Sequence, residues 1–228
     1  MITCARKIIS SHKSVEIGAY RELGLHPIRT TQREHRANWS QIMGISELKG
    51  AIVGIIGMGD IGMELARRCQ AFDMEVVYHQ REPHPKQVET MLGLRFLDID
   101  SLLSTADYVV LIIPQTPETE RLIGRDQFER MKPTAVLINV ARGGIVDEDA
   151  LYEALVSGQI AMAGLDVFRE EPLPVSSGLI GLPNVVLTPH TGGGSYLRRT
   201  DDRAAGLSNI LTFFDGGKPS GIVNRDCI

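Results

Sequence analysis

A glycine-rich turn between an apolar run and a helical pattern constrains the fold of this chain most. The run Ala51–Ile56 is short and apolar, which is typical of a strand buried on both faces of a parallel sheet. It leads into Gly57-Met58-Gly59-Asp60-Ile61-Gly62, which has the spacing G-x-G-x-x-G. Apolar residues at helical spacing follow up to Phe72. A strand, a glycine turn and a helix in this order favour a dinucleotide-binding unit.

The three glycines, Gly57, Gly59 and Gly62, have a physical reason in such a unit. A side chain would keep the backbone from approaching a pyrophosphate, and the helix that opens at Asp60 and Ile61 supplies free N–H groups and a partial positive charge. We therefore predict that Gly57, Gly59, Asp60, Ile61 and Gly62 bind a cofactor. The alternative is a tight turn with a structural role only.

The rest of the chain alternates apolar runs with helical patterns. We expect further strands at residues 75–78, 108–113, 135–139, 160–165 and 185–187. We expect helices at 60–72, 98–103, 147–156 and 195–214, and another that ends at 128–131. This alternation predicts an α/β fold with a Rossmann-type doubly wound parallel sheet. Residues 1–45 form an N-terminal helix and arm in this prediction, 46–195 the dinucleotide-binding domain, and 196–228 a C-terminal helix and tail.

Composition excludes several classes of partner. The 228 residues carry a formal net charge of −4, so no basic excess indicates nucleic acid or an anionic membrane. The longest apolar run, residues 108–113, is far shorter than the ~20 residues of a membrane helix, and we expect no secretory signal. Cys4, Cys69 and Cys227 are too few and too widely spaced for a disulfide framework or a zinc site. We therefore expect a cytoplasmic protein with free thiols and no metal.

The residues after the second predicted strand bear on the choice of cofactor. An acidic residue about 20 positions beyond the glycines would bind the ribose 2′-hydroxyl of NAD. The sequence instead has His79, Gln80 and Arg81, and Arg81 can pair with a 2′-phosphate, with His79 and Lys86 adding positive charge. We therefore expect NADP(H) to be preferred over NAD(H), with contacts from Gln80 and Arg81. The alternative is that Arg81 is a solvated charge at a strand end.

Polar side chains also follow the later predicted strands. Arg142 comes after the strand at 135–139, Asp166 and Glu171 after the strand at 160–165, and His190 after the strand at 185–187. The carboxyl ends of parallel strands meet at one edge of the sheet, where ligands bind. There Arg142 can clamp a carboxylate, and a histidine is a useful acid when a neighbouring carboxylate favours its charged form. We predict Arg142, Glu171 and His190 as catalytic; the alternative is that they form structural loop bonds.

At this point the sequence resembles a known family, the D-isomer-specific 2-hydroxyacid dehydrogenases, which include glyoxylate/hydroxypyruvate reductases. The matching stretches keep a specific order and spacing between about Leu48 and Gly194: Leu48-Lys49-Gly50, Val53–Gly62, Pro114–Thr119, Ile138–Asp147, Gly164–Phe168, Glu170–Pro174 and Pro183–His190. The resemblance implies hydride transfer between NAD(P)H and a small 2-oxo or 2-hydroxy acid.

The resemblance also implies individual roles. Arg142 would hold the substrate carboxylate and carbonyl, His190 would exchange the proton, and Glu171 would be the partner of His190. Asp166 would contact the nicotinamide end. The remaining residues that would line the cofactor cleft are Pro114, Thr119, Val140 and Ala141.

Length is the main departure from the family, whose members usually exceed 300 residues. Most of their N-terminal substrate domain has no counterpart here, and residues 1–45 resemble the helix and arm that pair two cofactor domains. The resemblance therefore implies a homodimer through residues 1–45. Two alternatives to an oxidoreductase stay open: a non-catalytic nucleotide-binding or regulatory module, and a methyltransferase that uses the same fold. The combination of Arg142, Glu171 and His190 disfavours the methyltransferase. The sequence does not identify the 2-hydroxy acid.

Overall fold

The computed structural model describes residues 1–33, 35–193 and 196–222, with side chains omitted for residues 196–202. The chain divides into two compact units, Met1–His190 and Thr191–Ile228. The boundaries expected at residues 45/46 and 195/196 stay predictions. No helix in the described part of the chain is long and apolar enough to cross a bilayer.

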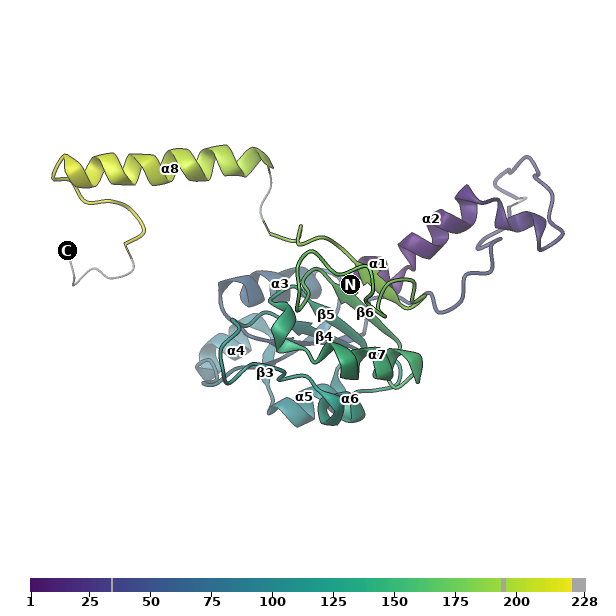
Figure 1. Ribbon diagram of the computed structural model, residues 1–228, viewed down its shortest axis with the longest axis horizontal. Helices are drawn as coiled ribbons and strands as arrows, with labels where there is room; N and C mark the ends of the chain where they lie inside the picture. Colours follow the sequence, from purple (N-terminus) through teal and green to yellow (C-terminus); the bar gives the residue numbers. More distant parts are fainter. Residues whose placement is uncertain (34, 194–195, 223–228) are drawn as a thin grey trace. The chain divides into compact units, whose positions relative to one another are not determined.

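The first unit is built on a seven-stranded sheet in which all paired strands are parallel (Figure 1). The strands are β1 (Ile52–Ile56), β2 (Glu75–His79), β3 (Leu94–Phe96), β4 (Tyr108–Leu111), β5 (Val136–Asn139), β6 (Met162–Leu165) and β7 (Val185–Leu187). Their order is β3-β2-β1-β4-β5-β6-β7. The direction of winding reverses between β1 and β4, where open α/β sheets form a ligand crevice. The predicted fold class is confirmed.

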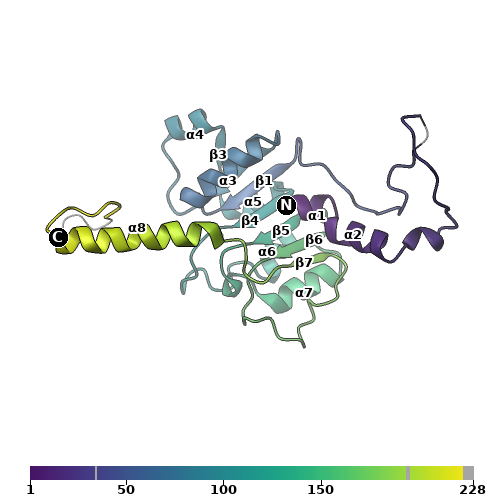
Figure 2. The ribbon, with the colours of Figure 1, turned by 90° about the horizontal axis from the view of Figure 1, so that it is seen from above.

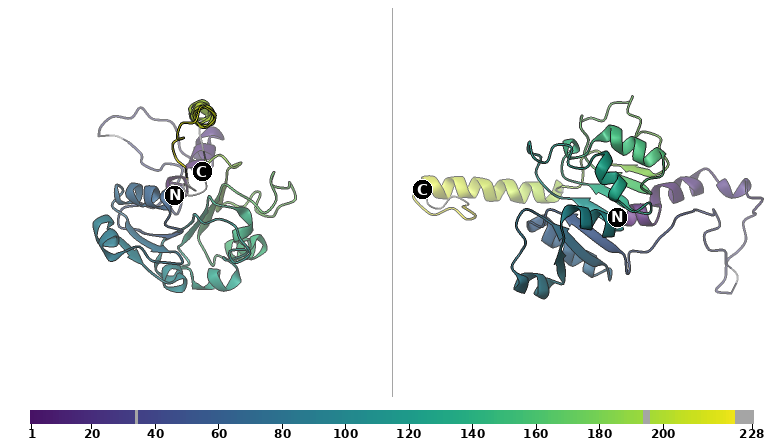
Figure 3. Two further views of the ribbon diagram at one scale, coloured as in Figure 1. Left: turned by 90° about the vertical axis from the view of Figure 1, so that its left-hand side faces the viewer. Right: turned by 90° about the horizontal axis from the view of Figure 1, so that it is seen from below.

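Helices lie on both faces of the sheet (Figures 2 and 3). They are α3 (Asp60–Gln70), α4 (Lys86–Leu92), α5 (Ile99–Thr105), α6 (Arg125–Arg130) and α7 (Glu148–Val156), with a 3₁₀ turn η2 (Gly143–Ile145). Aspartate side chains cap the N-termini of α5 and α7. The Asp98 carboxylate accepts from the Ser101 N–H at 2.9 Å, and the Asp147 carboxylate accepts from the N–H groups of Asp149 and Ala150, each at 3.2 Å.

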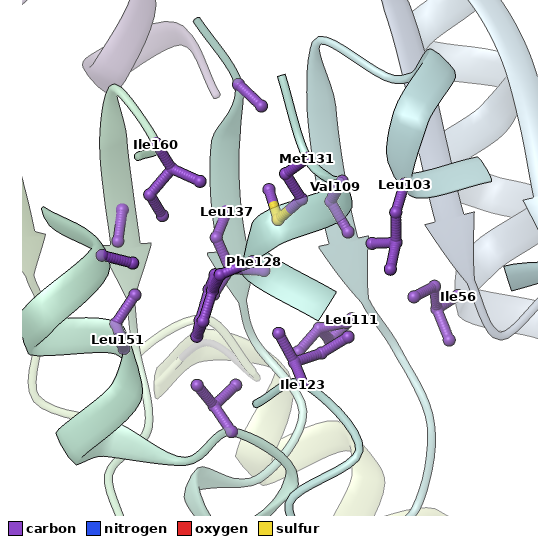
Figure 4. Close-up of a cluster of buried hydrophobic side chains, with 14 of the residues drawn as sticks. Ile56, Leu103, Val109, Leu111, Ile123, Phe128, Met131, Leu137, Leu151 and Ile160 are labelled. Carbon is purple, nitrogen blue, oxygen red and sulfur yellow. The ribbon is translucent and has the colours of Figure 1, made fainter. Parts of the chain in front are cut away.

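The side chains of the central strands alternate between two hydrophobic clusters. Val109, Leu111 and Leu137 pack with Phe128 of α6 on one face (Figure 4). Their neighbours on the same strands, Tyr108, Val110, Val136 and Ile138, belong to the cluster on the other face, which includes residues of α3. Because successive side chains of a strand point to opposite faces, both faces need apolar residues, and this explains the continuous apolar runs.

One helix and one strand were absent from the prediction. Both α4 and β3 lie between residues 86 and 96, and Gly93, with φ +58°, ends α4 and turns the chain into β3. The equally short α5 and β7 were predicted from an acidic first turn and a continuous apolar run, whereas α4 begins without a side-chain cap and β3 has a charged residue at its centre. The predicted helix 60–72 ends earlier, at Gln70, and the predicted strand 108–113 ends at Leu111. Residue 195, where the last helix was expected to begin, lies outside the described residues.

The N-terminal segment is partly built into the core. It contains α1 (Ile2–Ala5), α2 (Ile8–Glu16) and a 3₁₀ turn η1 (Ala19–Arg21), followed by irregular chain. Cys4 and Ala5 of α1 are buried against the sheet, where a side chain on Gly164 would come within 3.2 Å of the Cys4 Sγ. Beyond α1 the segment is mostly exposed. In the second unit, α8 (Tyr196–Phe214) is followed by a tail whose Ser220 N–H donates to the Asn209 side chain at 3.0 Å.

Candidate active site

The three glycines of the turn between β1 and α3 have three different environments. Gly57 has φ +105°, and a Cβ there would lie 2.1 Å from the Ile112 carbonyl oxygen. A Cβ on Gly62 would lie 2.3 Å from the Gly57 carbonyl oxygen, so this glycine allows α3 to pack against the turn. A Cβ on Gly59 would meet no atom within 4 Å. The turn therefore needs Gly57 and Gly62 for its own shape, whereas Gly59 faces open space.

The open space lies at the start of α3. Gly59 is the N-cap residue and offers no side-chain acceptor to the N–H groups of the first turn. The side chain of Ile61 is 69% exposed. Uncapped N–H groups at a helix N-terminus, with no side chain in front of them, suit a phosphate. The residues present therefore fit the pyrophosphate of a dinucleotide, and Gly57, Gly59, Asp60, Ile61 and Gly62 lie together here.

The loop after β2 lies beside this turn, because the Gly57 N–H donates to the His79 carbonyl at 2.9 Å. The Gln80 side-chain amide donates to the Glu82 carbonyl at 2.6 Å, within its own loop. Arg81 is exposed. The pKa of Glu118 is lowered, first by a hydrogen bond from Thr116 and to a lesser degree by the charge of Arg81. Arg81 thus lies within electrostatic reach of the loop that follows β4.

Pro114 and Thr119 belong to that second loop. The Thr119 hydroxyl donates to the Pro114 carbonyl at 2.9 Å and accepts from the Thr116 N–H at 2.7 Å. Pro114 is exposed. The Thr119 hydroxyl therefore holds the turn in shape at the carboxyl end of β4.

A buried asparagine shapes the turn that carries Arg142. Asn139, at the end of β5, accepts from the Ala141 N–H at 3.1 Å and donates to the Arg142 carbonyl at 2.9 Å. Ala141 is buried, whereas Val140 and the Arg142 side chain are exposed. The prediction had missed Asn139 as a determinant of this turn. The available signal was the asparagine itself, because an Asn side chain often binds backbone groups two or three residues further along the chain.

Gly143 brings two segments together. A Cβ on Gly143 would lie 1.9 Å from the carbonyl carbon of Phe168, so only glycine allows the turn after β5 to touch the loop after β6. That loop carries Glu171. The close approach of the two backbones therefore places Arg142 and Glu171 near one another. Sequence reasoning could not identify this contact, because it joins residues far apart in the chain.

His190 and Glu171 form a hydrogen-bonded pair. The His190 Nδ1 lies 2.7 Å from Glu171 Oε2, and Glu171 Oε1 accepts from the Phe168 N–H at 3.1 Å. A carboxylate only accepts, so Nδ1 carries the proton of this bond. The second ring nitrogen, Nε2, can then exchange a proton with another group. The His190 side chain is 47% exposed and that of Glu171 36% exposed, so the pair is open to small molecules.

The electrostatics of the pair follow from its neighbours. The hydrogen bond from His190 is the largest cause that lowers the pKa of Glu171, followed by the Phe168 N–H. The charges of His190 and Arg142 lower it further. The structure thus brings all three predicted catalytic residues within electrostatic reach, at the carboxyl ends of β5, β6 and β7. The pair lines a cavity of ≈ 500 Å³ together with apolar residues that include Phe168, Leu173 and Leu187.

Asp166 lies behind His190. Its carboxylate is buried and accepts from the Thr188 hydroxyl at 2.5 Å, and its carbonyl accepts from the His190 N–H at 2.9 Å. His190 has φ +54°, an uncommon conformation for a residue with a side chain. Asp166 therefore joins the ends of β6 and β7 and helps hold the His190 backbone. Within residues 1–33, 35–193 and 196–222, no three His, Cys, Asp or Glu side chains gather as a metal site requires.

Comparisons with known proteins agree with this geometry. Residues 1–192 match the family model described as "D-isomer specific 2-hydroxyacid dehydrogenase, NAD binding domain". Glyoxylate/hydroxypyruvate reductase B of Escherichia fergusonii is 41% identical over 202 residues, which are 86% of this chain and 62% of that protein. Glyoxylate reductase of Thermococcus onnurineus is 38% identical over 229 residues, 100% of this chain and 64% of that protein.

Solved structures give the same result. A glyoxylate reductase from Paecilomyes thermophila superposes with a TM-score of 0.80 at 30% sequence identity, covering 99% of this chain and 62% of that one. The chain therefore spans less than two thirds of the length of each of these three relatives. The resemblance predicted from the sequence motifs is confirmed.

Proposed function

This chain belongs to the D-isomer-specific 2-hydroxyacid dehydrogenases, and we propose that it forms the cofactor-binding part of an NAD(P)H-dependent reductase of small 2-oxo acids. The main support is one observation: the hydrogen-bonded pair of His190 and Glu171 lies within electrostatic reach of Arg142. All three residues follow the carboxyl ends of strands, where parallel sheets bind ligands. The glycine turn opens at the same edge of the sheet and offers an uncapped helix N-terminus, which suits a phosphate.

The proposed chemistry assigns one task to each residue. The reduced nicotinamide supplies a hydride when bound. The Arg142 guanidinium binds the carboxylate of the 2-oxo acid and polarises its carbonyl, for which a planar two-pronged donor is suited. His190 delivers a proton from Nε2 to the carbonyl oxygen, so the oxygen becomes a hydroxyl as the carbon gains hydride. Glu171 accepts from Nδ1 throughout, and its negative charge stabilises the imidazolium.

NADP(H) is the proposed cofactor in preference to NAD(H). The support is the exposed Arg81 together with the absence of an acid at positions 79 to 81. Titration with each reduced cofactor tests this directly. Arg81→Ala is expected to weaken NADPH binding roughly tenfold, by loss of a charge-assisted bond, and to leave NADH binding almost unchanged. Tighter binding of NADH by the wild-type chain would contradict the preference.

Turnover tests the reaction. We expect the purified chain to oxidise NADPH in the presence of glyoxylate or hydroxypyruvate, and His190→Ala to abolish this oxidation without loss of cofactor binding. The second candidate is the non-catalytic nucleotide-binding module that the sequence left open. Cofactor binding without turnover of either 2-oxo acid by a folded chain would contradict turnover by this chain and would favour the module.

A homodimer through residues 1–45 is proposed as well. Apolar side chains beyond α1 are exposed there, including Ile9 (59%), Ile17 (61%) and Met43 (84%), which is costly for a lone chain in water. We expect light scattering to give the mass of two chains, and Ile9→Asp with Ile17→Asp to give the mass of one. A cytoplasmic location stays a proposal, supported by the free thiols of Cys4 and Cys69.

A further inference from the structure

We propose that His84 is a positioning residue for the cofactor, because it holds the glycine turn in the orientation that receives a pyrophosphate. The proposal rests on the dinucleotide binding proposed above. His84 lies in the loop between β2 and α4, 26 positions along the chain from Met58, the second residue of the glycine turn. Its Nε2 is 2.9 Å from the Met58 carbonyl oxygen. A carbonyl only accepts, so Nε2 carries the proton and donates it.

The hydrogen bond from His84 to the Met58 carbonyl also sets the direction of the Gly59 N–H, because both groups belong to the same peptide bond. The Met58 carbonyl and the Gly59 N–H belong to one planar trans peptide, in which they point in opposite directions. Fixing the oxygen therefore fixes the direction of the N–H. Gly59 is the position where a Cβ would meet no atom within 4 Å and where α3 begins without a side-chain cap. His84 thus orients the peptide at the point of the turn that is open to a ligand.

His84 is itself held by a buried network. Its backbone N–H donates to the Tyr78 hydroxyl at 2.7 Å, and that hydroxyl donates to Glu89 Oε1 at 2.8 Å. Tyr78 is fully buried and Glu89 is 4% exposed. The other Glu89 oxygen accepts from Lys86 at 2.7 Å, the largest cause that lowers the pKa of this carboxyl.

The rings of Tyr78 and His84 also pack with their centroids 5.6 Å apart. A buried carboxylate is expensive unless its bonds are satisfied, and Glu89 is bonded to Tyr78 and Lys86. Tyr78 in turn accepts from the His84 N–H through its hydroxyl and packs its ring against the His84 ring. The loop after β2 therefore holds His84 in place against the Met58 carbonyl of the glycine turn.

The role of His84 differs from that of Arg81 in the same loop. Arg81 is proposed to recognise the 2′-phosphate, which only NADP(H) carries. His84 acts on the peptide that faces the pyrophosphate, which both cofactors carry. Loss of His84 should therefore weaken both cofactors by the same factor, whereas loss of Arg81 should weaken NADPH alone.

The experiment compares full-length wild-type chain with His84→Ala, His84→Gln and, as a control, Gln87→Ala on the exposed surface of α4. The measurements are dissociation constants for NADPH and NADH from fluorescence titration, and hydrogen exchange of the Met58–Ile61 amides without cofactor. We expect His84→Ala to weaken both cofactors about three- to tenfold, as loss of one hydrogen bond would, and to speed exchange in the turn. His84→Gln retains a donor and should recover most of the affinity. The control should match wild type.

Unchanged affinities and exchange in His84→Ala would overturn the inference, as would a loss confined to NADPH or no recovery in His84→Gln. If His84→Ala does not fold, His84→Leu replaces it, since leucine fills the space without a donor. Failure of the wild-type chain to bind either cofactor would overturn the proposed function instead. In that case, exchange of the Met58–Ile61 amides still tests whether His84 holds the turn.

Discussion

Alanine at Gly59 and at Gly62 should separate cofactor binding from folding. Gly59 has φ −78° and ψ −162°, a conformation open to any residue, and its Cβ would meet no atom within 4 Å. Gly59→Ala should therefore stabilise the cofactor-free chain slightly, by about 0.5 kcal/mol, because alanine restricts the unfolded chain. The new methyl group would nevertheless stand between a pyrophosphate and the helix N-terminus. Loss of one charge-assisted hydrogen bond, about 1.5–3 kcal/mol, should weaken NADPH binding roughly ten- to a hundredfold.

Gly62→Ala is the matched comparison within the same turn. Its Cβ would lie 2.3 Å from the Gly57 carbonyl oxygen, so backbone must move and the free energy of unfolding should fall by about 1–3 kcal/mol. Urea unfolding without cofactor and fluorescence titration with NADPH measure the two effects on each variant. The reasoning is refuted if Gly59→Ala loses more than about 1 kcal/mol of stability, or if it binds NADPH as tightly as wild type.

Two further predictions concern Glu171 and Asp147. The pKa of Glu171 is depressed in the folded chain, so its stabilisation is present above its unfolded pKa and is lost as pH falls through the folded pKa. The stability difference between wild type and Glu171→Gln in urea should accordingly shrink in acid, and the same substitution should lower turnover roughly a hundredfold. A difference that grows in acid would contradict this sign. Asp147→Ala removes the cap of α7 and should cost about 1 kcal/mol of stability, measured by thermal unfolding; an unchanged midpoint would show that the cap contributes nothing.

Local rules explain which parts of the fold could be predicted. The strand, glycine turn and helix around Gly57 follow from apolar runs and backbone freedom within about 20 residues, and the structure places them within a residue or two of expectation. The sequence signals of α4 and β3 are weak, because α4 begins without a side-chain cap and β3 is interrupted by Arg95. Their stability depends on partners such as the buried bond between Tyr78 and Glu89, which no local pattern reveals.

In the candidate site, too, contacts between distant segments could not be predicted from local sequence patterns. The position of Arg142, Glu171 and His190 at one sheet edge was predictable, because each follows a recognisable strand and carboxyl ends of parallel strands share one edge. Their catalytic roles stay predictions. The roles of Gly143 and His84 were not predictable, since each depends on a backbone contact with a distant segment. The packing of α1 on the sheet was missed for a related reason: Cys4 fits there because Gly164 has no side chain.

A crystal structure of the chain with NADPH would test the central claim most directly. The account predicts the pyrophosphate against the N–H groups at the start of α3, the 2′-phosphate beside Arg81, and the nicotinamide on the side of the sheet edge where His190 and Glu171 meet. Phosphates bound elsewhere on the chain, or a nicotinamide directed away from His190, would contradict it.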